Sequence, residues 1–152
     1  MFKLTRHLNL SSSFSYMFTD VLPPVAFTAY NNISEFFQVG QIAQFVQTFS
    51  NIGGHYNPAT SSFVCPYKGV YVFSIHFSAD SNDRLRLTIV IDGVATVKAW
   101  AEAQYEITTG SAMVVSECGP SQMVWVETED DGIIEGGAPG LSHFAGYLLY
   151  AY

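Results

Sequence analysis

Two stretches near the middle of the chain alternate between apolar and more polar side chains. The apolar positions are Tyr71, Phe73, Ile75 and Phe77 in the first stretch, and Leu85, Leu87, Ile89 and Ile91 in the second. Because successive side chains of an extended chain point to opposite faces, this period of two predicts strands with one buried face. Shorter runs at 94–97, 111–115, 123–127 and 144–150 predict further strands.

Glycine, proline and asparagine separate these runs and predict the turns between them. Asp92-Gly93 is the strongest hairpin signal, because a tight two-residue turn requires positive φ there. Other turn signals lie at 53–54, 57–58, 66–69, 81–83, 118–120, 131–132 and 136–137. Many short strands joined by such turns indicate an all-β antiparallel sandwich or barrel.

One segment fits two periodicities. Ile42, Phe45, Val46 and Phe49 recur at the spacing of an amphipathic helix, with glutamines at 38, 41, 44 and 47 on the polar face. The same residues also fit a strand. On the pattern alone, helix and strand are equally supported here.

The composition is that of a single globular domain with few charges. Of 152 residues, 49% are hydrophobic and 15% aromatic, and the 12% that are charged are about half the roughly 25% usual for soluble domains. The aromatic content excludes disorder, and no stretch approaches the ~18 consecutive apolar residues of a membrane-spanning helix. A composition with so many apolar and so few charged residues is typical of one subunit of an obligate oligomer. A monomer with an exposed apolar surface has the same composition.

The net charge of −7 argues against a nucleic-acid partner. Thirteen acidic residues face only six basic ones, and the basic residues are scattered rather than clustered. Phosphate binding needs clustered Lys and Arg, so no nucleic-acid binding is expected. An acidic surface is compatible with a divalent cation or a basic partner.

The cysteines and the N-terminal segment leave alternatives open. Cys65 and Cys118 fit either one disulfide or two buried thiols, and their spacing suggests no zinc site. Residues 1–24 begin with two basic residues, as a signal peptide would, but serines and an asparagine interrupt the apolar core. We expect a weakly structured leader or arm at 1–24 and a globular domain at 25–152.

From about residue 25 to residue 152 the sequence resembles the globular C1q domain, most densely from residue 51 onward. It reads N-I-G-G-H-Y-N-P-A-T at 51–60, F-V-C-P at 63–66 and G-V-Y-V-F-S-I-H-F at 69–77. The opening A-F-T-A at 26–29, the V-W pair at 124–125 and the closing F-A-G-Y-L-L-Y at 144–150 continue the match in order. The matching positions are Phe27, Phe45, Asn51, Gly53, Gly54, Tyr56, Pro58, Phe63, Pro66, Gly69, Tyr71, Phe73, Trp125, Phe144 and Gly146.

The resemblance implies an antiparallel jelly-roll β-sandwich of about ten strands that assembles as a compact homotrimer. It favours a strand around Phe45. Gly146, in the middle of a strand, is expected to let a large ring approach closely. The chain departs from the family pattern at 119–125, where the turn before Trp125 is longer and lacks the usual aspartate.

Calcium is the sharpest candidate ligand. Some C1q-like trimers hold Ca²⁺ near the threefold axis with aspartates around a hairpin, and Asp92 matches the first of these. In the stretch of sequence that matches the second aspartate, the nearest carboxylate is that of Glu102. Carboxylate oxygens are ligands that suit Ca²⁺. The alternative for Asp92 is that it only forms the Asp-Gly turn.

The remaining candidates belong to one acidic loop and one exposed tyrosine. Glu129, Asp130 and Asp131 lie among five carboxylates within nine residues, which fit either a cationic ligand or a solvated loop. Tyr105 lies in a turn and is able to stack on a sugar. The histidines at 7, 55, 76 and 143 are dispersed, none has a partner in the sequence, and no catalytic motif occurs, so we expect no enzyme.

The resemblance implies a secreted, extracellular recognition protein of innate immunity. In this hypothesis the trimer binds glycans or microbial surface patterns without catalysis, with calcium as a possible bridge. The alternative is a secreted signalling ligand of the cerebellin or adipokine type that binds a protein receptor. Members of the family often carry a collagen-like stalk, and this sequence contains no Gly-X-Y repeat.

Overall fold

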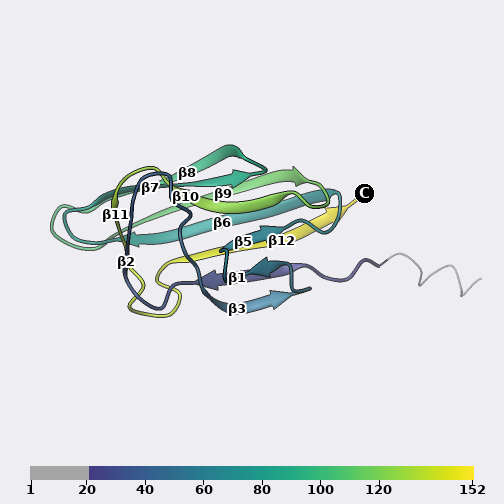
Figure 1. Ribbon diagram of the computed structural model, residues 1–152, viewed down its shortest axis with the longest axis horizontal. Helices are drawn as coiled ribbons and strands as arrows, with labels where there is room; N and C mark the ends of the chain where they lie inside the picture. The colour runs from purple at the N-terminus through teal and green to yellow at the C-terminus, as the bar shows by residue number, and fades with distance from the viewer. Residues whose placement is uncertain (1–20) are drawn as a thin grey trace, which may run out of the picture.

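A computed structural model describes residues 21–152 and shows two antiparallel β-sheets packed face to face (Figure 1). The first sheet has seven strands: β1 (Ala26–Tyr30), β2 (Glu35–Phe37), β3 (Gln47–Ile52), β6 (Gly69–Ala79), β9 (Thr108–Cys118), β11 (Gly132–Ile134) and β12 (His143–Ala151). The second has five: β4 (Tyr56–Asn57), β5 (Ser62–Val64), β7 (Arg84–Ile91), β8 (Val94–Glu102) and β10 (Met123–Thr128). The predicted all-β antiparallel sandwich is confirmed. Of the predicted arm at 1–24, residues 1–20 lie outside the described part.

The order of the strands is that of a jelly roll. In the seven-stranded sheet the order is β2-β11-β6-β12-β1-β3, with β9 on the other side of β6, so strands distant in the sequence are neighbours. The other sheet runs β4-β5-β10-β7-β8. The first and last strands of the chain, β1 and β12, lie side by side in the sheet (Figure 1).

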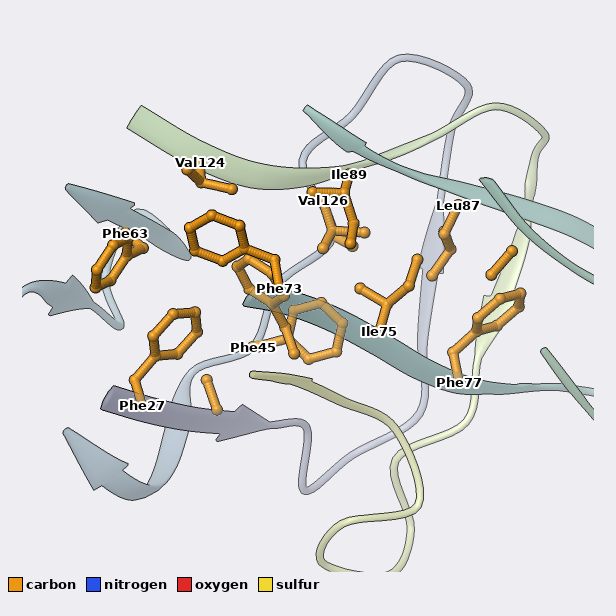
Figure 2. Close-up of a cluster of buried hydrophobic side chains, with 14 of the residues drawn as sticks. Phe27, Phe45, Phe63, Phe73, Ile75, Phe77, Leu87, Ile89, Val124 and Val126 are labelled. Atoms are coloured by element: carbon orange, nitrogen blue, oxygen red, sulfur yellow. The ribbon is translucent and has the colours of Figure 1, made fainter. Parts of the chain in front are cut away.

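The core lies between the sheets and consists of the alternating apolar positions (Figure 2). The residues predicted to face inward, from Tyr71 to Phe77 in β6 and from Leu85 to Ile91 in β7, are all buried there. The opposite face of β7, which was predicted to face away from the core, is also shielded from solvent, because Thr88 and Val90 are buried there. Burial on both faces makes β7 one of the most enclosed strands of the molecule.

Phe27 is the centre of an aromatic cluster in this core. Its ring stacks on Tyr56 at a centroid distance of 4.7 Å and on Phe63 at 5.0 Å, and meets Phe144 edge-on at 5.0 Å. Gly146 makes this cluster possible, since a Cβ there would lie 2.5 Å from the Phe73 ring and 2.8 Å from the Phe27 ring. The expected close approach of a ring at Gly146 is confirmed.

The segment with two periodicities forms neither a helix nor one continuous strand. Ile42 forms an isolated bridge with Glu127, and the Ala43 amide donates to the Val126 carbonyl at 2.9 Å. No regular ladder continues through residues 44–46, and β3 begins only at Gln47. Phe45 is nevertheless fully buried. Its carbonyl accepts a hydrogen bond from the Tyr56 hydroxyl at 2.8 Å, and its amide donates to the Ser61 hydroxyl at 2.9 Å. Side chains satisfy the backbone where no neighbouring strand does.

Asn51 closes the turn that follows β3. Its side-chain amide donates to the carbonyl of Tyr56 at 2.9 Å and accepts from the Tyr56 amide at 3.2 Å. Between them, Gly53 and Gly54 adopt φ of +87° and +72°, a backbone conformation that favours glycine. The Asn-x-Gly-Gly pattern is therefore architectural.

Candidate functional site

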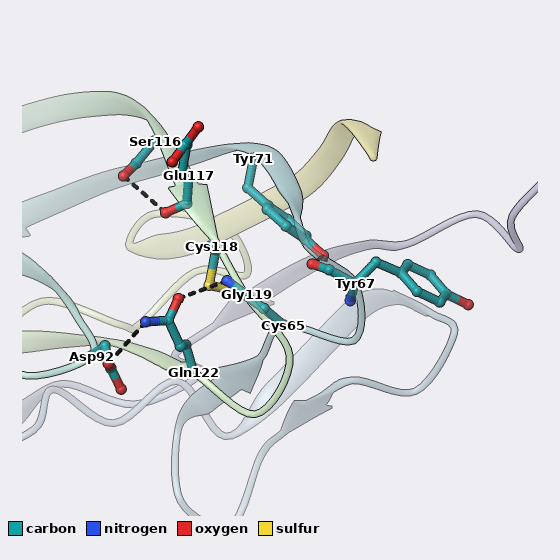
Figure 3. The surroundings of a disulfide bond; sticks show 9 residues. All are labelled: Cys65, Tyr67, Tyr71, Asp92, Ser116, Glu117, Cys118, Gly119 and Gln122. Atoms are coloured by element: carbon teal, nitrogen blue, oxygen red, sulfur yellow. Dashed lines mark hydrogen bonds between the residues drawn. A yellow bond between two sulfur atoms is a disulfide. The ribbon is translucent and has the colours of Figure 1, made fainter. Parts of the chain in front are cut away.

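The structure settles the open question about the cysteines (Figure 3). Cys65 and Cys118 form a disulfide across a Cα separation of 6.1 Å, and both are buried. The bond joins the segment before β6 to the end of β9. It lies at the same end of the sandwich as the C-terminal residues, because Gly69 pairs with both Cys118 and Ala151.

Asp92 lies at this end of the sandwich too and forms the predicted turn. Asp92 and Gly93 adopt φ of +50° and +80°, and they connect β7 to β8. One carboxylate oxygen of Asp92 accepts a hydrogen bond from the Gln122 side chain at 2.9 Å (Figure 3). The Gln122 side chain also accepts from the Gly119 amide at 2.6 Å. Gln122 thus organises the turn at 119–125 that departs from the family pattern.

Glu102 lies at the other end of the same hairpin. It pairs with Arg84, the first residue of β7, whereas Asp92 follows the last residue of β7. Eight residues at about 3.3 Å each separate the two positions by roughly 25 Å. Asp92 and Glu102 of one chain therefore cannot bind the same ion. Within residues 21–152, no three His, Cys, Asp or Glu side chains gather as metal ligands do.

Two carboxylates of the acidic loop form ion pairs with basic residues of the same chain. Asp130 accepts two hydrogen bonds from Arg86, at 2.7 and 2.8 Å. Glu129 pairs with Lys98 at 2.7 Å and accepts from the Thr88 hydroxyl at 2.5 Å. The hydrogen bonds from Arg86 lower the pKa of Asp130. Those from Lys98 and, secondly, from Thr88 lower the pKa of Glu129.

Asp131 also has a structural partner. Its carboxylate accepts a hydrogen bond from the Val39 amide at 2.7 Å, which fastens the loop after β2. From the sequence, Glu129, Asp130 and Asp131 fit either a site for a cationic ligand or a solvated loop. In the structure their carboxylates bind this chain's own basic groups and backbone, and they hold β7, β8 and the loop after β2 in place.

Glu102 and Tyr105 come together in one polar groove at the end of the sandwich opposite the disulfide. The groove has a volume of about 430 Å³ and is lined by Asn82, Asp83, Arg84, Glu102, Ala103, Gln104 and Tyr105. Tyr105 is 88% exposed. Beside the groove, the Arg84 guanidinium lies over the half-exposed ring of Trp100, 4.8 Å from its centre. Two aromatic faces, an arginine, two carboxylates and two amides therefore surround one depression.

Six further residues in or beside this groove were not predicted as site residues from the sequence: Asn82, Asp83, Arg84, Trp100, Ala103 and Gln104. The hairpin itself indicated that Arg84 lies near Glu102, because counting cross-strand pairs away from the turn at 92–93 brings these two residues close to each other. The bulge between Thr88 and Val90 shifts that register by one residue, so the pairing could not be read from the sequence.

Two of the histidines are not isolated, contrary to the expectation from the sequence. His76 of β6 and His143 of β12 are direct partners in the ladder, and their rings stack at a centroid distance of 5.3 Å. Both lie on the face of the seven-stranded sheet that points away from the core. His55 lies elsewhere, in the turn before β4, and His7 is outside the described residues.

The arrangement as a whole defines a binding module. A rigid sandwich presents a polar groove on its loops, and residues 21–152 contain no helix that could cross a membrane. Residues 26–149 match the family model of the C1q domain, and the chain belongs to this family. Domains of this family, which share the fold of tumour necrosis factor, recognise or bind ligands and are not enzymes.

Curated relatives include complement proteins and complement-related proteins. The chain is 29% identical over 111 residues to mouse complement C1q tumor necrosis factor-related protein 7, covering 70% of this chain and 37% of that protein. It is 27% identical over 135 residues to one of the polypeptides of the rat complement C1q subcomponent, covering 83% and 51% respectively. The chain thus spans about half the length, or less, of these relatives.

Solved structures show the same fold. The globular domain of zebrafish complement 1qA superposes with a TM-score of 0.70 at 21% identity, covering 84% of this chain and 99% of that one. The Eiger TNF of S. frugiperda superposes with a TM-score of 0.71 at 10% identity, covering 86% and 96%. At these identities the superpositions describe the fold alone.

Proposed function

We propose that this chain is the globular head of a secreted, homotrimeric recognition protein of innate immunity, which binds glycans of microbial surfaces in the groove beside Tyr105. The single observation that carries the proposal is the composition of that groove. Sugars present hydroxyl groups at their edges and C–H groups on their faces, and the groove offers polar side chains next to the exposed ring of Tyr105.

The proposed trimer is supported by the family and by the surface of the seven-stranded sheet. Members of the C1q and tumour-necrosis-factor family are trimeric. Exposed apolar side chains gather on the outer face of this sheet: Met113, Val115, Tyr147 and Leu149. A monomer would have to leave this apolar face in water, whereas a threefold assembly would cover it. Three grooves in one particle would convert individually weak sugar contacts into useful avidity.

The disulfide supports the proposed secretion. Disulfides persist in oxidising compartments and are rare in the cytosol, and Cys65–Cys118 is buried in the fold. The complement proteins among the relatives support the assignment to innate immunity.

A glycan array tests the proposed ligand class. The purified oligomer is compared with the variants Tyr105→Ala and Tyr152→Ala, the second being another solvent-facing tyrosine at the opposite end of the sandwich. Losing one stacking ring costs about 0.5–1.5 kcal/mol per site, so Tyr105→Ala should bind at least about twofold more weakly, and more so when avidity multiplies the loss. Tyr152→Ala should bind as the unchanged protein does. Absence of any glycan signal, or equal binding by all three proteins, would contradict the proposal.

Calcium enters as a separate arm of the same experiment. Since Asp92 and Glu102 of one chain lie at opposite ends of their hairpin, no intrachain pair of these two supports calcium, and ligands from several protomers would be required. Binding that disappears on chelation and returns with Ca²⁺ would support a metal in the assembled oligomer. Glycan binding that is unaffected by chelation would show that calcium is not required, and the groove beside Tyr105 would remain the proposed glycan site.

A signalling ligand that binds a protein receptor is the second candidate function. It is favoured by an apolar patch on and around β2, where Ile33, Phe36 and Val39 are 60%, 57% and 63% exposed. Apolar side chains of this kind suit a protein surface better than a sugar. Saturable binding to one cell-surface protein, reduced by Phe36→Ser and unchanged by Tyr105→Ala, would favour this function over the first.

A further inference from the structure

The outer face of the seven-stranded sheet is almost free of charge. Across β1, β6, β9 and β12, Glu117 is the single carboxylate and there is no lysine or arginine. Glu117 lies at the far end of β9 and accepts a hydrogen bond from the Tyr152 hydroxyl. This is the face that the proposed homotrimer covers, so a new charge on it would oppose assembly.

His76 and His143 are the groups on this face that can acquire charge near neutral pH. They occupy directly opposed positions of β6 and β12, are half-buried and stack at 5.3 Å with an interplanar angle of 25°. His76 Nδ1 lies 2.8 Å from the Ser111 hydroxyl of β9. His143 Nδ1 lies 3.0 Å from the Gly140 carbonyl, which only accepts, so this nitrogen carries a proton. The two Nδ1 atoms are thus occupied.

The surroundings contain nothing that would balance two imidazolium charges. The neighbours on this face are Ser74 and Ser78 of β6, Thr109, Ser111 and Met113 of β9, Ala145 of β12, and Thr28 and Tyr30 of β1. None of these side chains is a carboxylate, and the one ionisable group among them is the phenol of Tyr30. The loop before β12 carries one carboxylate, that of Glu135, which accepts a hydrogen bond from Ser34 at 2.5 Å. The pKa of His76 responds to burial and to His143, and Glu135 is not among its causes.

We propose that the stacked pair His76–His143 makes the homotrimer acid-labile: acidification adds imidazolium charge to a sheet face that holds no counter-charge, and this charge separates the protomers. The proposal rests on the proposed trimer and names its partner, a second copy of this chain. Imidazolium charge would be added to an uncharged interface that offers hydroxyl groups around the pair but no counter-charge. Each charged ring would have to be desolvated on assembly, and the two rings of a pair would repel one another.

The direction of the pH dependence follows from the same geometry. Burial, and secondly the neighbouring His143, lower the pKa of His76 below its ordinary value. Covering the face in a trimer would bury the ring further and lower the pKa of His76 more. A histidine whose pKa is lower in the trimer than in the separate protomer opposes assembly once the pH falls through its value in the separate protomer, which for His76 already lies below the ordinary value of about 6.5.

Sedimentation equilibrium at fixed protein concentration tests the proposal, with samples at about pH 7.5 and about pH 5.5 and constant ionic strength. The unchanged protein should dissociate at least about tenfold more readily at the lower pH, which corresponds to about 1.4 kcal/mol. The variant His76→Gln/His143→Gln should change less than about threefold between the two pH values. His55→Gln, a substitution outside this face, should behave as the unchanged protein does. Far-UV circular dichroism should show folded β-structure in every sample.

The outcomes separate this proposal from the proposed function. A trimer of equal stability at both pH values would overturn the acid lability and leave the trimer standing. Equal dissociation of the unchanged protein and the double variant would also overturn it, because other groups would then be responsible. A monomer at both pH values would overturn the trimer itself. If the double variant fails to assemble at about pH 7.5, the single substitution His143→Gln replaces it, and its pH response should be smaller than that of the unchanged protein.

Discussion

Removing the disulfide should destabilise the fold by an amount that its position in the chain sets. Cys65 and Cys118 are 53 residues apart, so the bond closes a long loop that contains β6, β7, β8 and most of β9. The loop-entropy relation gives about 4 kcal/mol for a closure of this length. At roughly 2–4 °C per kcal/mol for a chain of this size, the midpoint of thermal unfolding should fall by about 8–16 °C.

Differential scanning calorimetry of the variant Cys65→Ala/Cys118→Ala measures this loss. Every sample must have the same protein concentration, because the stability of an oligomer depends on it. A reductant provides the matched control, since it should lower the midpoint of the unchanged protein toward that of the variant and leave the variant where it is. A fall of less than about 3 °C, or a midpoint insensitive to reductant, would refute the reasoning from loop closure.

The other predictions concern the core, one turn and the acidic loop. Gly146→Ala should cost about 1–3 kcal/mol in denaturant unfolding because the new methyl group meets the rings of the core, whereas Gly137→Ala, which has open space around it, should be close to neutral. Asn51→Ala should cost about 1–3 kcal/mol in the same measurement, because it leaves two backbone groups of the turn without partners. Since the pKa values of Glu129 and Asp130 are lowered in the folded chain, their ion pairs stabilise it above about pH 4.5, and this contribution is lost as the pH falls through the lowered values. The double substitution Glu129→Gln/Asp130→Asn should therefore reduce the drop in melting temperature between about pH 5 and about pH 3, and an unchanged drop would contradict this account.

The sandwich could be predicted because burial on one face imposes a period of two on each long strand. The positions from Tyr71 to Phe77 and from Leu85 to Ile91 therefore revealed both the strands and their buried faces. The segment around Phe45 could not be read in the same way. The backbone of Phe45 is held by hydrogen bonds with the side chains of Tyr56 and Ser61 rather than by a regular ladder, so no local period describes this segment.

The candidate site was harder to predict because its contacts depend on the register between distant strands. The sequence placed Asp92 in its turn correctly, but only the ladder of β7 and β8 shows that Glu102 lies at the opposite end. In the same way, Arg86 reaches Asp130 across 44 positions of the chain. Residue types and spacing identified the charged groups, and long-range pairing decided what each of them binds.

The stacked histidines illustrate the same limit. His76 and His143 are 67 positions apart, and they meet because β12, the last strand, inserts between β6 and β1. The local sequence around either histidine does not indicate that the other lies beside it. A pattern of isolated histidines in a sequence is therefore compatible with a pair on one sheet face.

The oligomeric state of the chain tests the central claim most directly, because the shared avidity of the grooves and the role of the histidines both depend on it. Sedimentation equilibrium at micromolar concentration and about pH 7.5 should give a mass of about 50 kDa, three times the 16.7 kDa of one chain. The largely uncharged outer face of the seven-stranded sheet would then be covered. A mass equal to that of a single chain would contradict the account, because this apolar face would stand free in solution.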